Sequence, residues 1–160
     1  MTRFLTRFVP AALVLGLVSC AQPVALPAIN KPATERKKEV PSVQRSERGK
    51  VSSISVTEVF AHQQAGDSII YDARPSYLFK QGHIPGAISM PRSICDEVIA
   101  VRKPELKAAR DQKKTIIVYC TGFLCSDART VANHLAKSGY SSSVFSGGWD
   151  SWKSAELPTE

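Results

Sequence analysis

Histidines and long apolar runs are scarce in this sequence. It has three histidines among 160 residues. His62 and His134 fall on predicted helices with no cluster partner in the sequence, so we expect no metal ion, and nothing indicates an organic cofactor. The apolar stretch at residues 9–18 is shorter than the roughly 20 residues that a transmembrane helix needs, so we do not expect a bilayer-spanning helix there. No internal repeat is visible, which excludes repeat architectures.

The part of the chain that is expected to fold also lacks an excess of basic residues. The whole chain carries a formal charge of +7. Residues 1–50 contain nine Lys and Arg against three Asp and Glu, whereas residues 51–160 contain twelve against eleven. A domain that binds DNA or RNA would carry the positive charge on itself. We therefore do not expect nucleic acid as a partner.

The amino-terminal segment has the organisation of an export signal. Arg3 and Arg7 provide a positive start, and the apolar residues 9–18 follow. The segment ends in LVSC at Cys20, which resembles the bacterial lipoprotein signal, in which residues 1–19 are removed and Cys20 is acylated. An acyl chain holds a protein on a membrane surface without spanning it, since each buried methylene contributes about 0.8 kcal/mol.

This resemblance implies a lipid-anchored protein of the bacterial cell envelope that faces the periplasm and contacts a membrane surface. Ala21, rather than Asp, follows the cysteine, which favours the outer membrane over the inner membrane. The alternative is an ordinary secretory signal cleaved just beyond Ala21, which would leave a soluble secreted or periplasmic protein.

Residues 20–50 have the composition of a linker. Prolines punctuate the segment, and a mixed charge run, ERKKE, occupies residues 35–39. Such a segment cannot bury enough apolar surface to fold, so we expect a flexible basic tether. The folded domain is expected over residues 51–160.

Short β-branched runs alternate with helix-like segments across residues 51–160. Ser55 and Glu58 form a capping box that opens the first predicted helix, and Gly66 ends it. Strands are expected at 68–72, 87–90, 115–119 and 143–146, helices at 56–65, 75–80, 97–110 (interrupted by Pro104) and 127–138, and a turn at 147–148. The alternation predicts an α/β fold with a mostly parallel sheet and helices on both faces.

The segment YCTGFLCS places two cysteines in a loop between a predicted strand and a predicted helix. Cys120 directly follows the strand at 115–119, so its sulfur should be presented at the edge of the sheet. The loop then enters the helix at 127–138, whose free N–H groups and dipole stabilise an anion. A thiol in this place is expected to have a lowered pKa and to be a nucleophile near neutral pH.

Three ordered motifs resemble those of the rhodanese-like domain family. The first, YDARPSYLFKQGHIPGAISMP at 71–91, contains Asp-x-Arg followed by Gly-His-Ile-Pro-Gly-Ala. The second, IIVYCTGFLCSDARTVANHL at 116–135, is similar to the family's active-site strand, loop and helix. The third, GYSSSVFSGGWDSW at 139–152, is similar to its closing segment. The resemblance covers nearly all of residues 52–158 and implies a rhodanese-like three-layer fold.

The resemblance also implies a sulfurtransferase whose nucleophile is Cys120. This cysteine would take a sulfane sulfur from a small donor, hold it as a persulfide and pass it to a thiol acceptor. Backbone N–H groups of the loop would surround the transferred sulfur, at Thr121, Gly122, Phe123, Leu124 and Cys125. Asp72, Arg74 and His83 match positions that are mainly structural in the family.

The loop departs from related families at two positions. Cys125 stands where many active rhodaneses have an Arg or Lys that closes the loop and attracts an anionic donor, which makes thiosulfate a doubtful donor. The nearest cation in sequence, Arg129, is expected on the following helix, where it need not reach the pocket. Ser126 stands where cysteine phosphatases and arsenate reductases have an arginine, so we expect neither activity.

Cys125 leaves two further functions open. In an oxidising envelope compartment it could pair with Cys120 or resolve a persulfide by attacking it, as in a thiol-disulfide or redox protein. Either reaction requires the two Cα atoms to come within about 7 Å. Cys95, expected in the connection between residues 90 and 97, could serve instead or be an inert small residue. The missing cation also allows a non-catalytic rhodanese-like binding module.

Overall fold

The computed structural model describes residues 47–160 of the chain. The predicted signal at residues 1–19, the acylated Cys20 and nearly all of the linker at 20–50 lie outside the described residues. Within residues 47–160, no helix is both long enough and apolar enough to cross a bilayer.

A five-stranded sheet forms the centre of the domain, in the order β1-β5-β4-β2-β3. Every pairing between neighbouring strands is parallel. The strands are β1 (Val51–Ser53), β2 (Ser68–Asp72), β3 (Ile88–Ser89), β4 (Thr115–Tyr119) and β5 (Ser142–Phe145). The predicted α/β fold with a parallel sheet is confirmed, and β2 and β4 have the predicted bounds.

The edge strand β1 is not predicted by the sequence. Of its three residues only Val51 is apolar, so the strand has no hydrophobic run. It forms because Val51 pairs with Ser142 of β5 and the hydroxyl groups of Ser52 and Ser143 lie 2.9 Å apart. A partner 91 residues away therefore determines this strand.

The helices are α1 (Val56–Ala65), α2 (Ser76–Gln81), the 3-10 turn η1 (Arg92–Ile94), α3 (Cys95–Val101), α4 (Lys103–Asp111), α5 (Asp127–Lys137) and α6 (Gly148–Ser154). The predicted capping box opens α1. The Ser55 hydroxyl accepts from the Glu58 N–H, and the Glu58 carboxylate accepts from the Ser55 N–H at 2.9 Å. Gly66 ends α1 in the left-handed conformation, with φ at 65°.

Two helical regions differ from the prediction. The interrupted helix at 97–110 is two helices, α3 and α4, and the chain breaks at Arg102 rather than at Pro104. Pro104 lies in the first turn of α4, where its missing N–H costs no hydrogen bond. The turn expected at 147–148 leads into α6, because the fully buried Trp152 packs this segment into the core.

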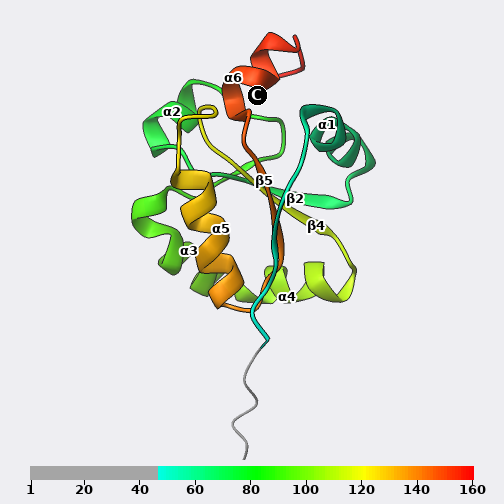
Figure 1. The fold of residues 1–160 in the computed structure, drawn as a ribbon, viewed down its shortest axis with the longest axis vertical. Helices are drawn as coiled ribbons and strands as arrows, with labels where there is room; N and C mark the ends of the chain where they lie inside the picture. Colours follow the sequence, from blue (N-terminus) through cyan, green and yellow to red (C-terminus); the bar gives the residue numbers. More distant parts are fainter. Residues whose placement is uncertain (1–46) are drawn as a thin grey trace, which may run out of the picture. The chain divides into compact units, whose positions relative to one another are not determined.

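Helices cover both faces of the sheet, which produces the predicted three layers (Figure 1). On one face, helices α3, α4 and α5 pack against the sheet, and Leu135 of α5 is fully buried in this cluster. On the other face, α1 and α6 pack against the sheet through Val59 and Trp152. Adjacent residues of β4, Ile117 and Val118, belong to the two opposite clusters, because successive strand residues point to opposite faces.

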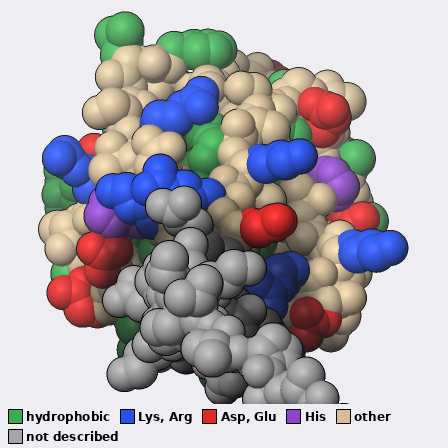
Figure 2. All heavy atoms as spheres, turned by 60° about the horizontal axis from the view of Figure 1, so that its bottom comes forward, with side chains coloured by type: hydrophobic (Ala, Val, Ile, Leu, Met, Phe, Trp, Pro, Cys, Tyr) green, Lys and Arg blue, Asp and Glu red, His purple; other side chains and the backbone are tan. Residues whose placement is uncertain are grey.

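Charged side chains of both signs share the face that Figure 2 shows. Lys and Arg are interspersed there with Asp, Glu and His, rather than gathered in one basic patch. This mixture agrees with the near balance of charge over residues 51–160.

Candidate active site at the carboxyl edge of the sheet

The carboxyl ends of β2 and β4 meet at the point where the strand order reverses. β2 leads to β3 on one side, whereas β4 leads to β5 on the other. In open parallel sheets, ligands bind in the crevice at such a point. Cys120 directly follows β4 and Ala73 directly follows β2, and the Ala73 N–H donates to the Tyr119 carbonyl at 2.8 Å. The candidate active site is this crevice.

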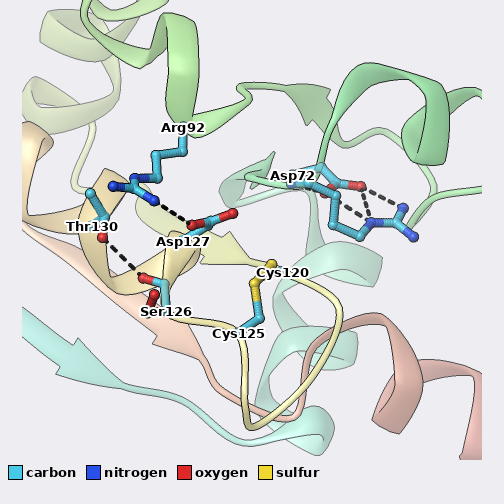
Figure 3. Close-up of a disulfide and its surroundings, with 8 residues drawn as sticks. Asp72, Arg92, Cys120, Cys125, Ser126, Asp127 and Thr130 are labelled. Atoms are coloured by element: carbon cyan, nitrogen blue, oxygen red, sulfur yellow. Dashed lines mark hydrogen bonds and ion pairs between the residues drawn. A yellow bond between two sulfur atoms is a disulfide. The ribbon is translucent and has the colours of Figure 1, made fainter.

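The predicted nucleophile, Cys120, is joined to Cys125 by a disulfide (Figure 3). Their Cα atoms lie 6.1 Å apart, within the limit of about 7 Å for such a bond. Cys120 is 3% exposed, whereas Phe123 and Leu124 between the cysteines are 78% and 103% exposed. The Cys125 N–H donates to the Gly122 carbonyl at 3.0 Å. In this disulfide form, that N–H is engaged within the loop rather than free to contact a transferred sulfur.

The start of α6 holds the cysteine loop in place. The N–H groups of Trp149 and Asp150 donate to the carbonyl oxygens of Cys120 and Thr121, at 2.9 and 2.8 Å. Gly148 permits this approach, because its φ is 57° and a Cβ atom would overlap the Cys120 carbonyl oxygen. The sequence predicts a Gly-Gly turn here, but no local pattern shows that it contacts the active-site loop.

Asp72, Arg74 and Tyr119 form a buried hydrogen-bonded network. Arg74 Nη2 donates to Asp72 Oδ2 at 2.6 Å, and Nε lies 3.0 Å from both carboxylate oxygens. The Tyr119 hydroxyl donates to Asp72 Oδ2 at 2.6 Å and accepts from the Ile84 N–H at 3.2 Å. Arg74 also donates to the Gly82 carbonyl at 2.7 Å. Both charges of the network are therefore paired, as their burial requires.

This network lies next to residues that hold the cysteine loop in place. Tyr119 immediately precedes Cys120, and the Arg74 guanidinium lies 4.8 Å from the centre of the Trp149 ring. Burial and the Asp72 carboxylate raise the pKa of Tyr119, so its hydroxyl stays protonated and donates. Burial opposes the charge of Arg74, but the hydrogen bond and charge of Asp72 outweigh it and raise the pKa of Arg74. Arg74 therefore stays charged in the core.

His83 is held by contacts outside the cysteine loop. Its ring stacks on Phe79, with 3.7 Å between the ring centres, and Nδ1 lies 3.0 Å from the Phe79 carbonyl. Its backbone exchanges two hydrogen bonds with Glu160, at 2.8 and 3.0 Å. These contacts connect the Gly-His-Ile-Pro turn to the carboxyl-terminal segment.

Two cavities lie beside the cysteine loop. The smaller, of about 240 Å³, is bounded by the loop, by the end of β5 and by Arg129. Arg129 therefore reaches this cavity from α5, whereas its place on the helix did not by itself predict that it would. The larger, of about 570 Å³, opens between the segments that follow β2 and β3, and both Arg92 and Asp127 line it. The three sequence motifs do not single out Arg92 or Asp127. The loops that follow parallel strands lie at one edge of the sheet, and this rule could have placed Arg92 near the cysteine loop.

The sequence shows no cluster partner for His62 or His134, but the fold places a carboxylate beside each of them. His62 Nδ1 lies 2.8 Å from Asp67, and His134 Nδ1 lies 2.6 Å from Asp96, because the fold brings their helices next to these carboxylates. Cys95 begins α3 instead of lying in a connection, and a polar atom of each of Cys95, Asp96 and His134 lies within 4.8 Å of the others. Burial raises the pKa of the Cys95 thiol, which is unpaired and 2% exposed.

The fold and the site define a class: a parallel α/β domain that presents a cysteine loop at the carboxyl edge of its sheet. The family model of the rhodanese-like domain matches residues 55–155. The chain therefore belongs to the rhodanese-like domain family, as the three motifs predict.

One curated relative of this chain is considerably longer than the matched region. The HTH-type transcriptional regulator Rv0324 of Mycobacterium tuberculosis is 31% identical over 108 residues, which are 68% of this chain and 44% of that protein. The chain thus spans less than half the length of this curated relative. In such a family, function depends on the residues at the site rather than on the fold.

Two solved structures illustrate the same similarity of fold. The BH2092 protein from Bacillus halodurans is 26% identical with a TM-score of 0.60, over 68% of this chain and 76% of that one. A protein of unknown function from Rhodopseudomonas palustris, described as a possible tyrosine phosphatase, is 25% identical with a TM-score of 0.55, over 69% of this chain and 85% of that one.

Proposed function

We propose that this domain transfers sulfane sulfur through Cys120. In the reduced protein, the Cys120 thiolate attacks the outer sulfur of a donor R–S–SH, which forms Cys120–S–SH and releases R–S⁻. An acceptor thiolate then takes this sulfur and regenerates the Cys120 thiolate. The observation that carries the proposal is the position of Cys120, which directly follows β4 in a loop that enters α5 at its amino end.

Cys125 is proposed as a resolving thiol. Its thiolate attacks the Cys120 sulfur of the persulfide, which forms the Cys120–Cys125 disulfide and releases HS⁻. Two molecules of a thiol R–SH then return the pair to two thiols and leave as R–S–S–R. The 6.1 Å between the Cα atoms supports this step. The disulfide is thus the form that each resolved turnover leaves until the thiols reduce it.

The disulfide also favours a second candidate, thiol-disulfide exchange without sulfur transfer. A third candidate is a non-catalytic binding module, favoured by the absence of an Arg or Lys at position 125. Thiosulfate is the least favoured donor for the same reason. The sequence at residues 1–20 supports lipid anchoring in the bacterial envelope, and the balanced charge of residues 51–160 supports the proposal that nucleic acid is not a partner.

The test is the intact mass of the reduced protein after exposure to a panel of sulfane-sulfur donors. The expected result is a gain of one sulfur atom in wild type and in Cys95→Ser, but not in Cys120→Ser. Cys125→Ser should retain the added sulfur longer than wild type, because it cannot form the disulfide.

Other results select the other candidates. Loss of two hydrogen atoms with no sulfur-bearing intermediate, in wild type but not in Cys125→Ser, would mean thiol-disulfide exchange alone. An unchanged mass with every donor would refute both kinds of cysteine chemistry and leave the binding module.

A further inference from the structure

The larger cavity beside the cysteine loop has the size and lining of a small-molecule site. Its 570 Å³ falls within the roughly 300 to 1,000 Å³ that such sites occupy. Apolar and hydroxyl side chains line it together with one cation and one carboxylate: Ala73, Pro75, Ser76, Pro91, Arg92, Ser93, Ile94 and Asp127. We call it the Arg92 cleft. The sulfur chemistry described above does not by itself assign any role to it.

The two charges of the cleft are close together and remain open to a ligand. Arg92 Nη1 lies 3.4 Å from Asp127 Oδ1, which is longer than the roughly 2.7–2.9 Å of a strong charge-assisted hydrogen bond. The Arg92 side chain is 61% exposed and that of Asp127 is 29% exposed. Within residues 47–160, this contact is the single hydrogen bond of the Arg92 guanidinium, which has five N–H donors. The remaining donors are free to bind an anionic group.

The charge pair also lies beside the reacting sulfur. A carboxylate oxygen of Asp127 and the sulfur atoms of Cys120 and Cys125 all lie within 4.8 Å of one another. Figure 3 shows the Asp127 carboxylate between the Arg92 guanidinium and the disulfide. Cys120 itself lines the smaller cavity, so Asp127 is the residue that connects the Arg92 cleft to the reacting sulfur, and the sulfur of a molecule bound to the charge pair would approach Cys120 past Asp127.

We propose that the Arg92 cleft binds the amino-acid group of a low-molecular-weight thiol and of its persulfide. The α-carboxylate would bind the Arg92 guanidinium, and the α-ammonium would bind the Asp127 carboxylate. The apolar walls would contact the short carbon chain that leads to sulfur. This inference rests on the proposed function, for which it names the class of R in R–S–SH and R–SH.

The charge of the cleft also disfavours an inorganic dianion. Thiosulfate carries two negative charges, and from the Arg92 cleft it would approach Cys120 past the Asp127 carboxylate. Like charges at this separation repel, and a single exposed guanidinium already engaged with Asp127 offsets only part of that repulsion. A zwitterion satisfies both groups at once.

The experiment compares three persulfide donors that share the sulfur chemistry and differ in charge. Cysteine persulfide has both groups, 3-mercaptopropionate persulfide has only the carboxylate, and cysteamine persulfide has only the ammonium. Second-order rates of sulfur loading onto Cys120 are measured by intact mass on the reduced full chain. Arg92→Gln and Asp127→Asn are compared with Arg102→Gln, whose ion pair with Glu105 does not line the cleft.

Wild type should load fastest from cysteine persulfide. Arg92→Gln should slow the two carboxylate-bearing donors by about tenfold, the size of one charge-assisted hydrogen bond, and cysteamine persulfide by less than about twofold. Asp127→Asn should slow the two ammonium-bearing donors and spare 3-mercaptopropionate persulfide. Arg102→Gln should match wild type with all three.

Two outcomes would overturn the inference in distinguishable ways. Sulfur loading that is equal for the three donors, or that Arg92→Gln slows equally for all of them, would reject the zwitterion site and leave the sulfurtransferase intact. No loading from any donor onto wild-type Cys120 would refute the proposed function and this inference with it.

Discussion

Reduction of the Cys120–Cys125 disulfide should lower the free energy of unfolding by about 2 kcal/mol. The bond joins residues with a sequence separation of 5, so it closes a very short loop. In the chain-entropy account, closing a loop of about five residues removes about 7 cal/mol/K from the unfolded ensemble, or about 2 kcal/mol at 25 °C. The stabilisation is small because a short loop excludes few unfolded conformations.

Urea unfolding at equilibrium measures this difference. With a slope of about 2 kcal/mol/M, the midpoint of the reduced protein should lie about 1 M below that of the oxidised protein, at an unchanged slope. Cys125→Ser is the matched control, because it cannot form the bond and should unfold at one midpoint with or without reductant. Cys95 should not complicate the comparison, since it is buried and unpaired.

Two results would contradict the reasoning. Coincident midpoints for the oxidised and reduced proteins would mean that the bond adds nothing to folding, and the chain-entropy account would fail here. A reductant-dependent shift that persists in Cys125→Ser would mean that a different group is responsible. A loss near 2 kcal/mol would leave the domain folded in both states, as the proposed cycle between them requires.

Two further predictions concern the core. Asp72→Asn should lower the free energy of unfolding by about 3–5 kcal/mol, because it leaves the Arg74 charge buried without a counter-charge. The control Arg102→Gln breaks an exposed ion pair and should cost less than about 1 kcal/mol, so similar losses for both variants in urea unfolding would contradict the prediction. The free energy of unfolding should also fall as the pH rises through about 8.5–10. Burial raises the pKa of Cys95 and of Tyr71 in the folded protein, so the unfolded chain loses these protons first. A free energy of unfolding that does not change over this pH range would refute the prediction, and Cys95→Ser should make the fall with pH less steep.

Local sequence signals predict most of the fold. The capping box at Ser55 and Glu58 and the glycine at position 66 locate α1, because each acts on backbone groups within a few residues. The apolar runs of β2 and β4 identify buried strands, since a parallel sheet covered on both faces needs continuous hydrophobic residues. The short edge strand β1 and the helix α6 have no such local signal.

Local sequence signals likewise predict one part of the candidate site and not the other. Cys120 is found from the sequence because the strand, the cysteine and the helix follow one another directly along the chain. Arg92 and Asp127 are 35 residues apart, and no spacing rule connects them. They meet because the loops after parallel strands gather at one edge of the sheet.

The sequence by itself determined the family and the α/β class and predicted Cys120 as the nucleophile, because these inferences depend on local motifs and on the period of apolar residues. The tertiary structure decided the pairing of Cys120 with Cys125, the support of their loop by α6 and the charges of the Arg92 cleft. It also placed the Tyr119 hydroxyl on Asp72, across 47 residues. Such contacts depend on how the elements pack, and packing is settled only when the whole sheet and its helices have assembled.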